Sequence, residues 1–285
     1  MNPKRGAKKL AVGAAISNAG LAPTALKLLK MGYGPLPESP GGNSTACVSV
    51  DFDVTQPSRF DDNRKGTLAL CELAARYGVP ITWAVCGKSA EEDMRSYSAI
   101  AEAAGGSEIG VHTYSHLDAT VAGKDEFRSD IERCIQVLGL ASPRTFVFPW
   151  NREAHFDVLQ SMGFRVYRGK DRAVGAPILN QGLWNVRPVY YVDQKSRGAE
   201  SLIKKYVDLC IHYSTPFHLW THPWAMVVGG GTTEMLRTME SLFAYIVEKR
   251  AGKSMETSTL GAFAATLATP AETRPEPLST LVHAS

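Results

Sequence analysis

The sequence has few cysteines and no long apolar run, and both absences limit what the chain can be. Its five cysteines are scattered and odd in number, which argues against a disulfide framework or a cysteine-ligated zinc site and favours a reducing compartment. No stretch approaches the roughly 20 apolar residues that a membrane-spanning helix needs. A net charge of only +3 argues against a nucleic-acid-binding surface. The 44% of hydrophobic residues then indicates a globular protein.

The N-terminal part differs in composition from the rest of the chain. Residues 1–45 join two basic stretches, a weakly apolar run over 10–22 and a Pro/Gly-rich linker over 32–43. Ser17 and Asn18 interrupt the apolar run, which is unlike a secretory signal. We therefore expect an N-terminal helical extension and linker, with peripheral contact to a partner or a membrane surface as its candidate role.

Residues 46–268 alternate short apolar runs with amphipathic segments and are expected to form one domain. Residues 269–285, rich in Pro, Thr, Glu and Ala, are expected to be a disordered tail. The expected strands are 46–52, 80–85, 108–112, 145–148, 165–168, 184–190 and 217–221. Helical spacing of apolar residues is seen over 64–77, 124–138, 153–162, 200–213 and 233–249. This α/β alternation predicts a (β/α) barrel, with a doubly wound open sheet as the alternative.

Two groups of potential metal ligands follow expected strands. Asp51 and Asp53 project from one face of the first strand, and a cation beside them would relieve the repulsion between their charges. His112 and His116 follow the third strand at a spacing that lets two imidazoles bind one ion. Each group alone has a structural alternative, a turn pair for the aspartates and packed or exposed histidines. Together they match the open three-ligand site of a catalytic zinc.

Aromatic and polar residues follow two further strands. The fourth strand leads into Trp150, and the last leads into His222 and Trp224. Together with Tyr114, these tryptophans are candidates for the wall of a substrate site, with core packing as the alternative. His218 lies about 13 Å from His222 along an extended strand, so we expect it to be structural.

The order of four motifs resembles the polysaccharide deacetylases, the NodB-homology domains of carbohydrate esterase family four. The motifs are VSVDFD (48–53), HTYSH (112–116), FPWN (148–151) and WTHP (220–223), and the resemblance covers about residues 46–265. It implies a distorted, seven-stranded (β/α) barrel. It also implies a divalent metal ion, with Zn²⁺ as the expected ion, held by Asp53, His112 and His116. Asp51 would be the catalytic base and His222 the general acid.

The implied activity is removal of an N-acetyl group from a sugar in a polysaccharide, a glycolipid or a sugar precursor. Metal-activated water attacks the amide, Asp51 takes the proton of the water, and His222 protonates the departing amine. The backbone N–H of Trp150 is the candidate second donor to the oxyanion, because Pro149 has no N–H. The expected partner is therefore an N-acetylated carbohydrate.

The sequence departs from the family pattern in three places. Val147 stands where the family often has an Arg that contacts the base, which leaves Arg152, Arg168 and Arg187 as replacements. Phe52 separates the two aspartates of the first motif, which leaves open which of them is the ligand. The Asp-Trp motif is not recognisable, and Asp171 and Trp184 are candidates for it.

Two other functions stay open on the sequence alone. A related barrel amidohydrolase could use the same chemistry on a small non-sugar amide, and a non-catalytic carbohydrate-binding homologue could retain the site. The free cysteines and the interrupted N-terminal run favour the cytoplasm, whereas the resemblance keeps secretion as the alternative.

Overall fold

The computed structural model describes residues 32–33, 43–53, 57–103, 106–227 and 232–267. The expected helical extension and the expected tail therefore lie outside the described residues, apart from two short pieces at 32–33 and 43–45. Among the described residues, none of the helices is long and apolar enough to cross a membrane.

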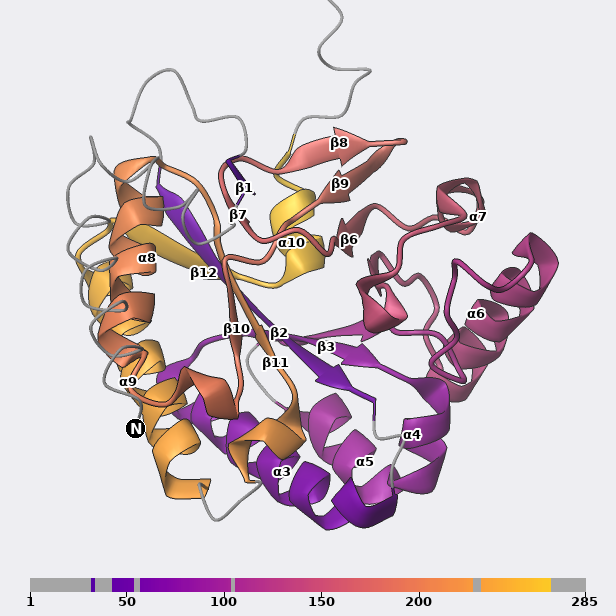
Figure 1. The fold of residues 1–285 in the computed structure, drawn as a ribbon, viewed down its shortest axis with the longest axis horizontal. Helices are drawn as coiled ribbons and strands as arrows, with labels where there is room; N and C mark the ends of the chain where they lie inside the picture. Colours follow the sequence, from indigo (N-terminus) through magenta and orange to yellow (C-terminus); the bar gives the residue numbers. More distant parts are fainter. Residues whose placement is uncertain (1–31, 34–42, 54–56, 104–105, 228–231, 268–285) are drawn as a thin grey trace, which may run out of the picture.

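A curved parallel sheet forms the centre of the fold (Figure 1). Neighbouring strands run in the order β10, β11, β2, β3, β4, β5, β6 and β9, and each of these pairs is parallel. Their bounds are β2 Ser44–Phe52, β3 Ile81–Val85, β4 Glu108–Val111, β5 Thr145–Val147, β6 Val166–Arg168, β9 Leu183–Asn185, β10 Tyr190–Val192 and β11 Phe217–Thr221. Four short strands complete the pairing, namely β1 Gly32–Tyr33 with β7 Ala173–Val174, β8 Ile178–Asn180 with β9, and β12 Met255–Ser258 with β2.

Most helices lie around the outside of this sheet (Figure 1). They are α3 Phe60–Tyr77, α4 Gly87–Glu92, α5 Met94–Glu102, α6 Lys124–Leu138, α7 Phe156–Ser161, α8 Glu200–His212, α9 Thr232–Ala251 and α10 Leu260–Ala264. Helix α6 illustrates the local cause, because Phe127, Ile131, Cys134 and Leu138 recur at helical spacing on its buried face. Gly139 ends it in the left-handed conformation, with φ of 64°.

The distorted barrel predicted from the sequence is confirmed, and the distortion arises at one expected strand. Residues 184–190 do not form one strand, because the chain changes partner within them. β9 pairs with β6, whereas β10 pairs with β11 on the other side of the barrel. Between them Val186 N–H donates to Tyr167 and Val189 N–H donates to His218, so this segment spans the gap between the two edges. The doubly wound open sheet is therefore not the architecture.

A polar cluster secures the end of the barrel at which the strands begin. Glu108 at the start of β4 accepts hydrogen bonds from Thr145, Thr82 and the Gly261 N–H. Thr259 caps the short helix α10 by accepting from the Ala262 N–H. α10 thereby packs onto β2 and β6 and leaves the opposite end of the barrel, where the strands finish, for the polar motifs.

Close packing at one glycine connects the outer helix α3 to that functional end. The 3₁₀ turn η4 (Pro223–Met226) directly follows His222 and packs against α3. A Cβ atom built on Gly66 of α3 would overlap the carbonyl oxygen of Pro223. Because the obstacle is backbone, a larger residue at this position must displace the helix or the turn.

We predict that Gly66→Ala lowers the free energy of unfolding by about 3 kcal/mol, as expected for overpacking against rigid backbone. Lys65→Ala, at an exposed position of the same helix, is the matched control and should change it by less than about 0.5 kcal/mol. Urea denaturation followed by circular dichroism measures both. Equal stability of the two variants would contradict the close approach of α3 and η4.

Candidate metal and hydrolytic site

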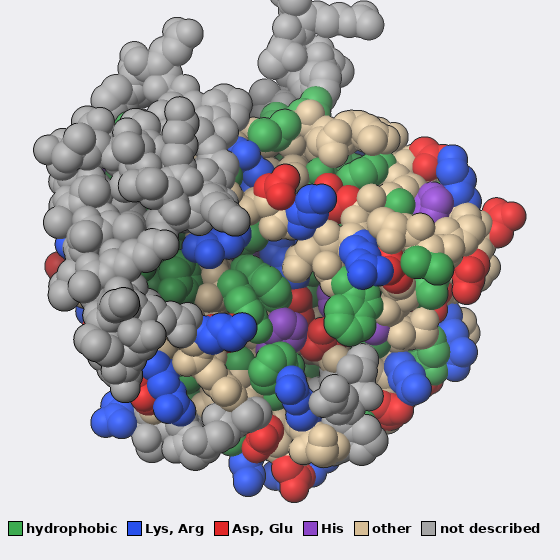
Figure 2. Space-filling model, in the orientation of Figure 1, with side chains coloured by type: hydrophobic (Ala, Val, Ile, Leu, Met, Phe, Trp, Pro, Cys, Tyr) green, Lys and Arg blue, Asp and Glu red, His purple; other side chains and the backbone are tan. Residues whose placement is uncertain are grey.

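The carboxyl ends of β2, β4 and β11 bring the expected site residues into one cleft of about 340 Å³. Histidine side chains are visible in a hollow on this face of the molecule (Figure 2). The cleft is lined by Asp51, Asp53, Arg59, His112, His116, Trp150, Asn151, Arg168, Trp220, His222 and Trp224. Residues from five distant segments of the sequence therefore share one site, as expected for side chains at the ends of parallel strands.

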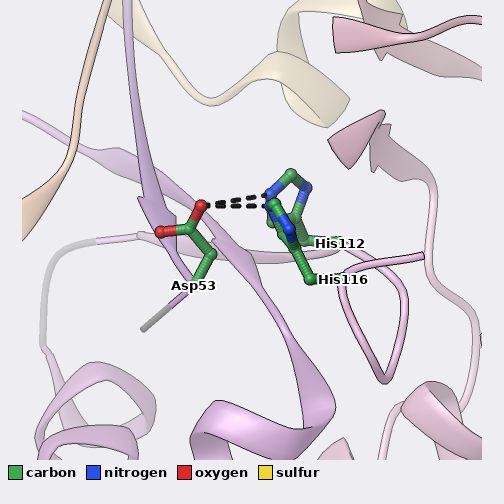
Figure 3. A group of neighbouring side chains, drawn as sticks. All are labelled: Asp53, His112 and His116. Carbon is green, nitrogen blue, oxygen red and sulfur yellow. Dashed lines mark ion pairs between the residues drawn. The ribbon is translucent and has the colours of Figure 1, made fainter. Parts of the chain in front are cut away.

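Asp53, His112 and His116 form a group with the donor set of a metal site. One ligand atom from each lies within 4.8 Å of the others. Asp53 Oδ2 is 3.2 Å from His116 Nε2 and 3.8 Å from His112 Nε2, and both imidazoles face the carboxylate (Figure 3). The imidazoles of His112, His116 and His222 outweigh the effect of burial and hold the pKa of Asp53 well below its usual range.

The hydrogen bonds of His112 leave its inner nitrogen available to a cation. Its Nδ1–H donates to the carbonyl oxygen of Val147 at 2.8 Å, so Nε2 carries the free lone pair. His112 Nε2 and Asp53 Oδ1 are both buried and have no hydrogen-bond partner among the described residues. Buried polar atoms without partners are costly, and a cation placed between these atoms would satisfy them.

A strained loop presents His116, and the sequence analysis missed the residue that holds it. Thr113 and His116 both have φ of 59°, a left-handed backbone that non-glycine residues rarely adopt. Asp130 of α6 accepts hydrogen bonds from the backbone N–H groups of Tyr114 and Ser115 at 2.6 and 3.2 Å. These bonds compensate for the strain in the HTYSH motif. An aspartate on a helix sixteen residues from the motif has no signal in the sequence that would identify it.

Asp51 forms a buried ion pair with Arg168. Two guanidinium nitrogens of Arg168 donate to the two carboxylate oxygens of Asp51, each at 2.5 Å. Burial alone would raise the pKa of Asp51, but the charge and hydrogen bonds of Arg168 outweigh it and lower that pKa. Asp51 is therefore ionised at neutral pH.

Arg168 occupies the place expected for the missing arginine of the third motif. It lies directly opposite Val147 in the register of β5 and β6, so the two side chains share one face of the sheet. The other candidates are used elsewhere, since Arg152 pairs with Asp118 and Arg187 donates to the carbonyl of Ala176. The choice among three arginines that the sequence left open is thus decided by geometry.

Two contacts besides the ion pair with Asp51, one with Trp220 and one with Ser49, help to hold Arg168 in place. Its guanidinium carbon lies 4.0 Å from the ring centre of Trp220, and Nη1 is 3.3 Å from Ser49 Oγ. Ser49 Oγ is also 2.8 Å from His218 Nε2, and His218 Nδ1–H donates to the carbonyl of Val186. Since Nδ1 carries the proton of a neutral His218, Ser49 donates its O–H to Nε2 and its oxygen accepts from Arg168. Burial, reinforced by the charge of Arg168, lowers the pKa of His218 to about 3.

His222, directly after the neighbouring strand β11, faces both aspartates. Its Nε2 is 3.5 Å from Asp53 Oδ2 and 3.9 Å from Asp51 Oδ2. Burial would lower the pKa of His222, but the carboxylates of Asp53 and Asp51 outweigh it and raise that pKa. Its Nδ1 is 3.1 Å from the hydroxyl of Tyr191, a contact that the sequence analysis did not identify.

The structure places two of the three candidate residues for the wall of the substrate site in the cleft and the third outside it. Trp150 is 63% exposed, lies edge-on to His116 at 4.7 Å between ring centres, and lines the cleft, as does Trp224. Tyr114 is not among the residues that line this cleft, so its expected role there stays a prediction without support from the geometry. Its hydroxyl donates to Glu91 and accepts from Arg133, whose guanidinium covers its ring at 3.6 Å. Thr113 has a left-handed backbone, so the motif does not continue as the extended chain that its sequence suggests.

The two candidates for the Asp-Trp motif do not line the cleft either. Trp184 lines a separate cavity of about 590 Å³, and Asp171 lines an open depression beside Trp150. Trp220 of β11 is the tryptophan that packs on the guanidinium of Arg168, which pairs with Asp51.

Comparison with known proteins gives a family match over the first half of the barrel. Residues 44–166 match the family model described as polysaccharide deacetylase. The comparison with curated proteins gave no match.

Solved structures share the fold at low sequence identity. A Mycobacterium smegmatis protein assigned to the polysaccharide deacetylases is 20% identical, with a TM-score of 0.63 over 87% of this chain and 100% of its own. A Pseudomonas aeruginosa PAO1 protein with the same assignment is 15% identical, with a TM-score of 0.61 over 81% and 93%. A mutant of a Bacillus anthracis family 4 pseudoenzyme with restored enzymatic activity is 14% identical, with a TM-score of 0.52 over 78% and 67%. At these identities the likeness shows the fold alone.

We predict that His218 makes the protein sensitive to acid. Its pKa is about 3 in the folded chain and about 6.5 in the unfolded chain, so the unfolded state binds the proton first as the pH falls. The stabilisation is complete above pH 6.5 and decreases progressively toward pH 3. Between pH 7.5 and 5 it amounts to about 2 kcal/mol.

Urea denaturation at both pH values tests this contribution. His218→Gln should lose about 2 kcal/mol less than the parent chain on acidification. His212→Gln, at an exposed histidine, is the control and should behave as the parent does. The same acid sensitivity in the parent and in His218→Gln would rule out a buried neutral imidazole.

Proposed function

We propose that the chain, whose residues 44–166 match the polysaccharide deacetylase family model, is a member of that family and hydrolyses the amide bond of an N-acetyl group on a sugar. The family resemblance implies hydrolases that act on amide bonds. One observation carries the proposal. Asp53, His112 and His116 converge beside an ionised Asp51, and Asp53 Oδ1 and His112 Nε2 are buried without a hydrogen-bond partner among the described residues.

The donor set fits a divalent metal ion. Asp53, His112 and His116 would hold it, with zinc as the expected ion, although two imidazoles and one carboxylate accept several divalent metals. When bound, such an ion polarises an amide carbonyl and lowers the pKa of a water molecule toward neutrality.

Asp51 is proposed as the base that removes a proton from the attacking water. Arg168 keeps it ionised and fixes the plane of its carboxylate, while each oxygen retains a lone pair beyond the one that the guanidinium uses. The ion pair already binds Asp51, which supports Asp53 as the aspartate that acts as the ligand.

His222 is proposed as the acid that protonates the departing amine. The neighbouring carboxylates favour its charged form, in which both ring nitrogens carry protons. Nδ1–H can then donate to Tyr191, which leaves Nε2–H directed toward the aspartates and the reacting atoms. The backbone N–H of Trp150 remains the candidate donor to the oxyanion.

The apolar surfaces beside this group favour a sugar as the substrate. Trp150 and Trp224 present ring surfaces to the cleft, and aromatic rings pack well against the apolar face of a pyranose or against an acetyl methyl group. The exposed Trp150 stands at the border between the cleft and the depression that contains Asp171, which gives a substrate room to extend.

We predict that the zinc-loaded protein releases acetate and a free amine from N-acetylglucosamine oligomers. Asp51→Asn should retain the metal and lose about 10²–10⁴-fold in kcat, the usual contribution of a general base. His112→Ala and His116→Ala should each lose metal and activity together. Metal analysis and an amine-release assay measure these outcomes, with His212→Ala as the exposed control.

Three results separate the remaining functions. If the protein hydrolyses small non-sugar amides but not the oligomers, its substrate is a non-sugar amide and not an N-acetylated sugar. Sugar binding without turnover in the metal-loaded parent would indicate a non-catalytic homologue. A metal-free His112→Ala variant with full activity would refute the proposed ligands.

We also predict that Arg168 acts by positioning Asp51. Arg168→Lys keeps the charge but loses the paired hydrogen bonds, so kcat should fall about 10- to 100-fold while KM and metal content change little. Ser49→Ala removes one support of the guanidinium and should lower kcat in the same direction by a smaller factor.

A double-mutant cycle on kcat provides the control for these two variants. If Ser49 acts through Arg168, Ser49→Ala should have little further effect in the Arg168→Lys background. Independent, multiplicative losses would show that Ser49 supports the fold and not the base.

A further inference from the structure

The cleft contains a second arginine, Arg59, that the proposed chemistry does not use. It ends the 3₁₀ turn η1 (Pro57–Arg59) ahead of α3 and lines the same cleft as the aspartates. Its guanidinium carbon lies 4.1 Å from the ring centre of Trp224, and that ring lies 4.9 Å from the ring of His222. Guanidinium, indole and imidazole therefore follow one another along one wall, and His222 is the member nearest the reacting atoms.

Arg59 has no carboxylate partner in the part of the chain that the structure describes. Its counterparts nearby are paired, Arg64 with Asp93 and Arg168 with Asp51. The undescribed residues 54–56 and 228–231, which adjoin this wall in sequence, contain no Asp or Glu. Stacking on Trp224 uses the face of the guanidinium and leaves its N–H edges free to donate.

The charges of the lining residues explain what such a group would bind. The carboxylates of Asp51 and Asp53 balance the guanidinium groups of Arg168 and Arg59, so a divalent ion in the proposed metal site leaves excess positive charge in the cleft. Lys and Arg side chains also border the hollow that holds the histidines (Figure 2). Fields of this sign attract anions and strengthen inside a partly desolvated cleft.

We propose that Arg59 binds an anionic group of the substrate, a carboxylate or a phosphate, so that the cleft selects negatively charged N-acetylated sugars over neutral ones. This inference rests on the proposed deacetylase function for its choice of sugar, while the anion-binding step belongs to Arg59 itself. The guanidinium donates paired hydrogen bonds to the anion, which a lysine or an amide cannot reproduce.

Hydrolysis of three matched probes by the zinc-loaded full chain tests the selectivity. The probes are N-acetylglucosamine, which is neutral, N-acetylmuramic acid, which adds a carboxylate, and N-acetylglucosamine 6-phosphate. We expect kcat/KM to favour one anionic probe over the neutral one by about tenfold or more, the effect of a charge-assisted hydrogen bond. Which anionic probe is favoured distinguishes carboxylate from phosphate.

Variants assign that selectivity to one residue. Arg59→Gln should reduce the ratio of anionic to neutral kcat/KM about tenfold, and Arg59→Lys should restore it only in part. Arg95→Gln removes the same charge at an exposed position of α5 outside the cleft and should leave the ratio unchanged. A ratio that survives Arg59→Gln, or one that Arg95→Gln reduces equally, would overturn the proposal.

A binding measurement keeps the inference testable if none of the probes is hydrolysed. Calorimetry with the chelator-treated protein compares the affinities of the three probes without any turnover. The anionic preference of the parent should exceed that of Arg59→Gln by about tenfold. Absence of turnover with this binding difference intact would reject the deacetylase function alone, whereas equal preferences in the parent and the variant would reject the role of Arg59.

Discussion

Two neighbouring carboxylates at the end of one strand set the requirements for the rest of the site. Asp51 and Asp53 both project from the end of β2, and neither ion is stable there without a compensating positive charge. The fold answers the two in different ways. Asp51 receives a permanent cation in Arg168, while Asp53 faces the imidazoles of His112 and His116, and His112 Nε2 and Asp53 Oδ1 have no hydrogen-bond partner among the described residues. This difference divides the pair into a fixed carboxylate and a ligand.

The separation of roles follows from how each cation is bound. A guanidinium does not lose its proton in proteins, so the ion pair of Asp51 lasts as long as its carboxylate stays ionised. The imidazoles of His112 and His116 have lone pairs to share, and a metal ion is the cation that uses them. If the two partners were exchanged, the proposed base Asp51 would bind the metal ion and the proposed ligand Asp53 would pair with the arginine.

The residues that sequence reasoning found are those that local rules fix. Asp51, Asp53, His112 and His222 lie at or directly after the ends of strands, and the strand ends of a parallel barrel meet at one face whatever the loops do. Arg168, Ser49 and Tyr191 reach the site through pairing between segments far apart in the chain, and no local pattern distinguishes them from other buried residues. Tyr114 does not line the cleft, and a left-handed turn lies inside its own motif, at Thr113.

The fold was predictable to a similar degree and for similar reasons. Strands such as β2 can be predicted from the sequence, because nearly all of its nine residues are buried and form a continuous, mostly apolar run. The division of residues 184–190 between β9 and β10 depends on which edge of the curved sheet each half meets, and this is a property of the whole sheet. Short strands such as β12 owe their existence to an available neighbour and not to their own composition.

The substitution of Val147 shows why motif positions and chemical roles can separate. In the register of the sheet, Val147 of β5 and Arg168 of β6 are direct partners, so a guanidinium can come from either strand and reach the same aspartate. The chemistry requires a planar cation beside Asp51 at that height in the barrel and does not specify which strand supplies it. Arg168 in turn needs its own support, and the buried chain of Ser49, His218 and the Val186 carbonyl provides it. A barrel can therefore change a residue of a motif and keep the guanidinium–aspartate pair. This requires that the neighbouring strand lies in register and that other buried groups hydrogen-bond to the guanidinium.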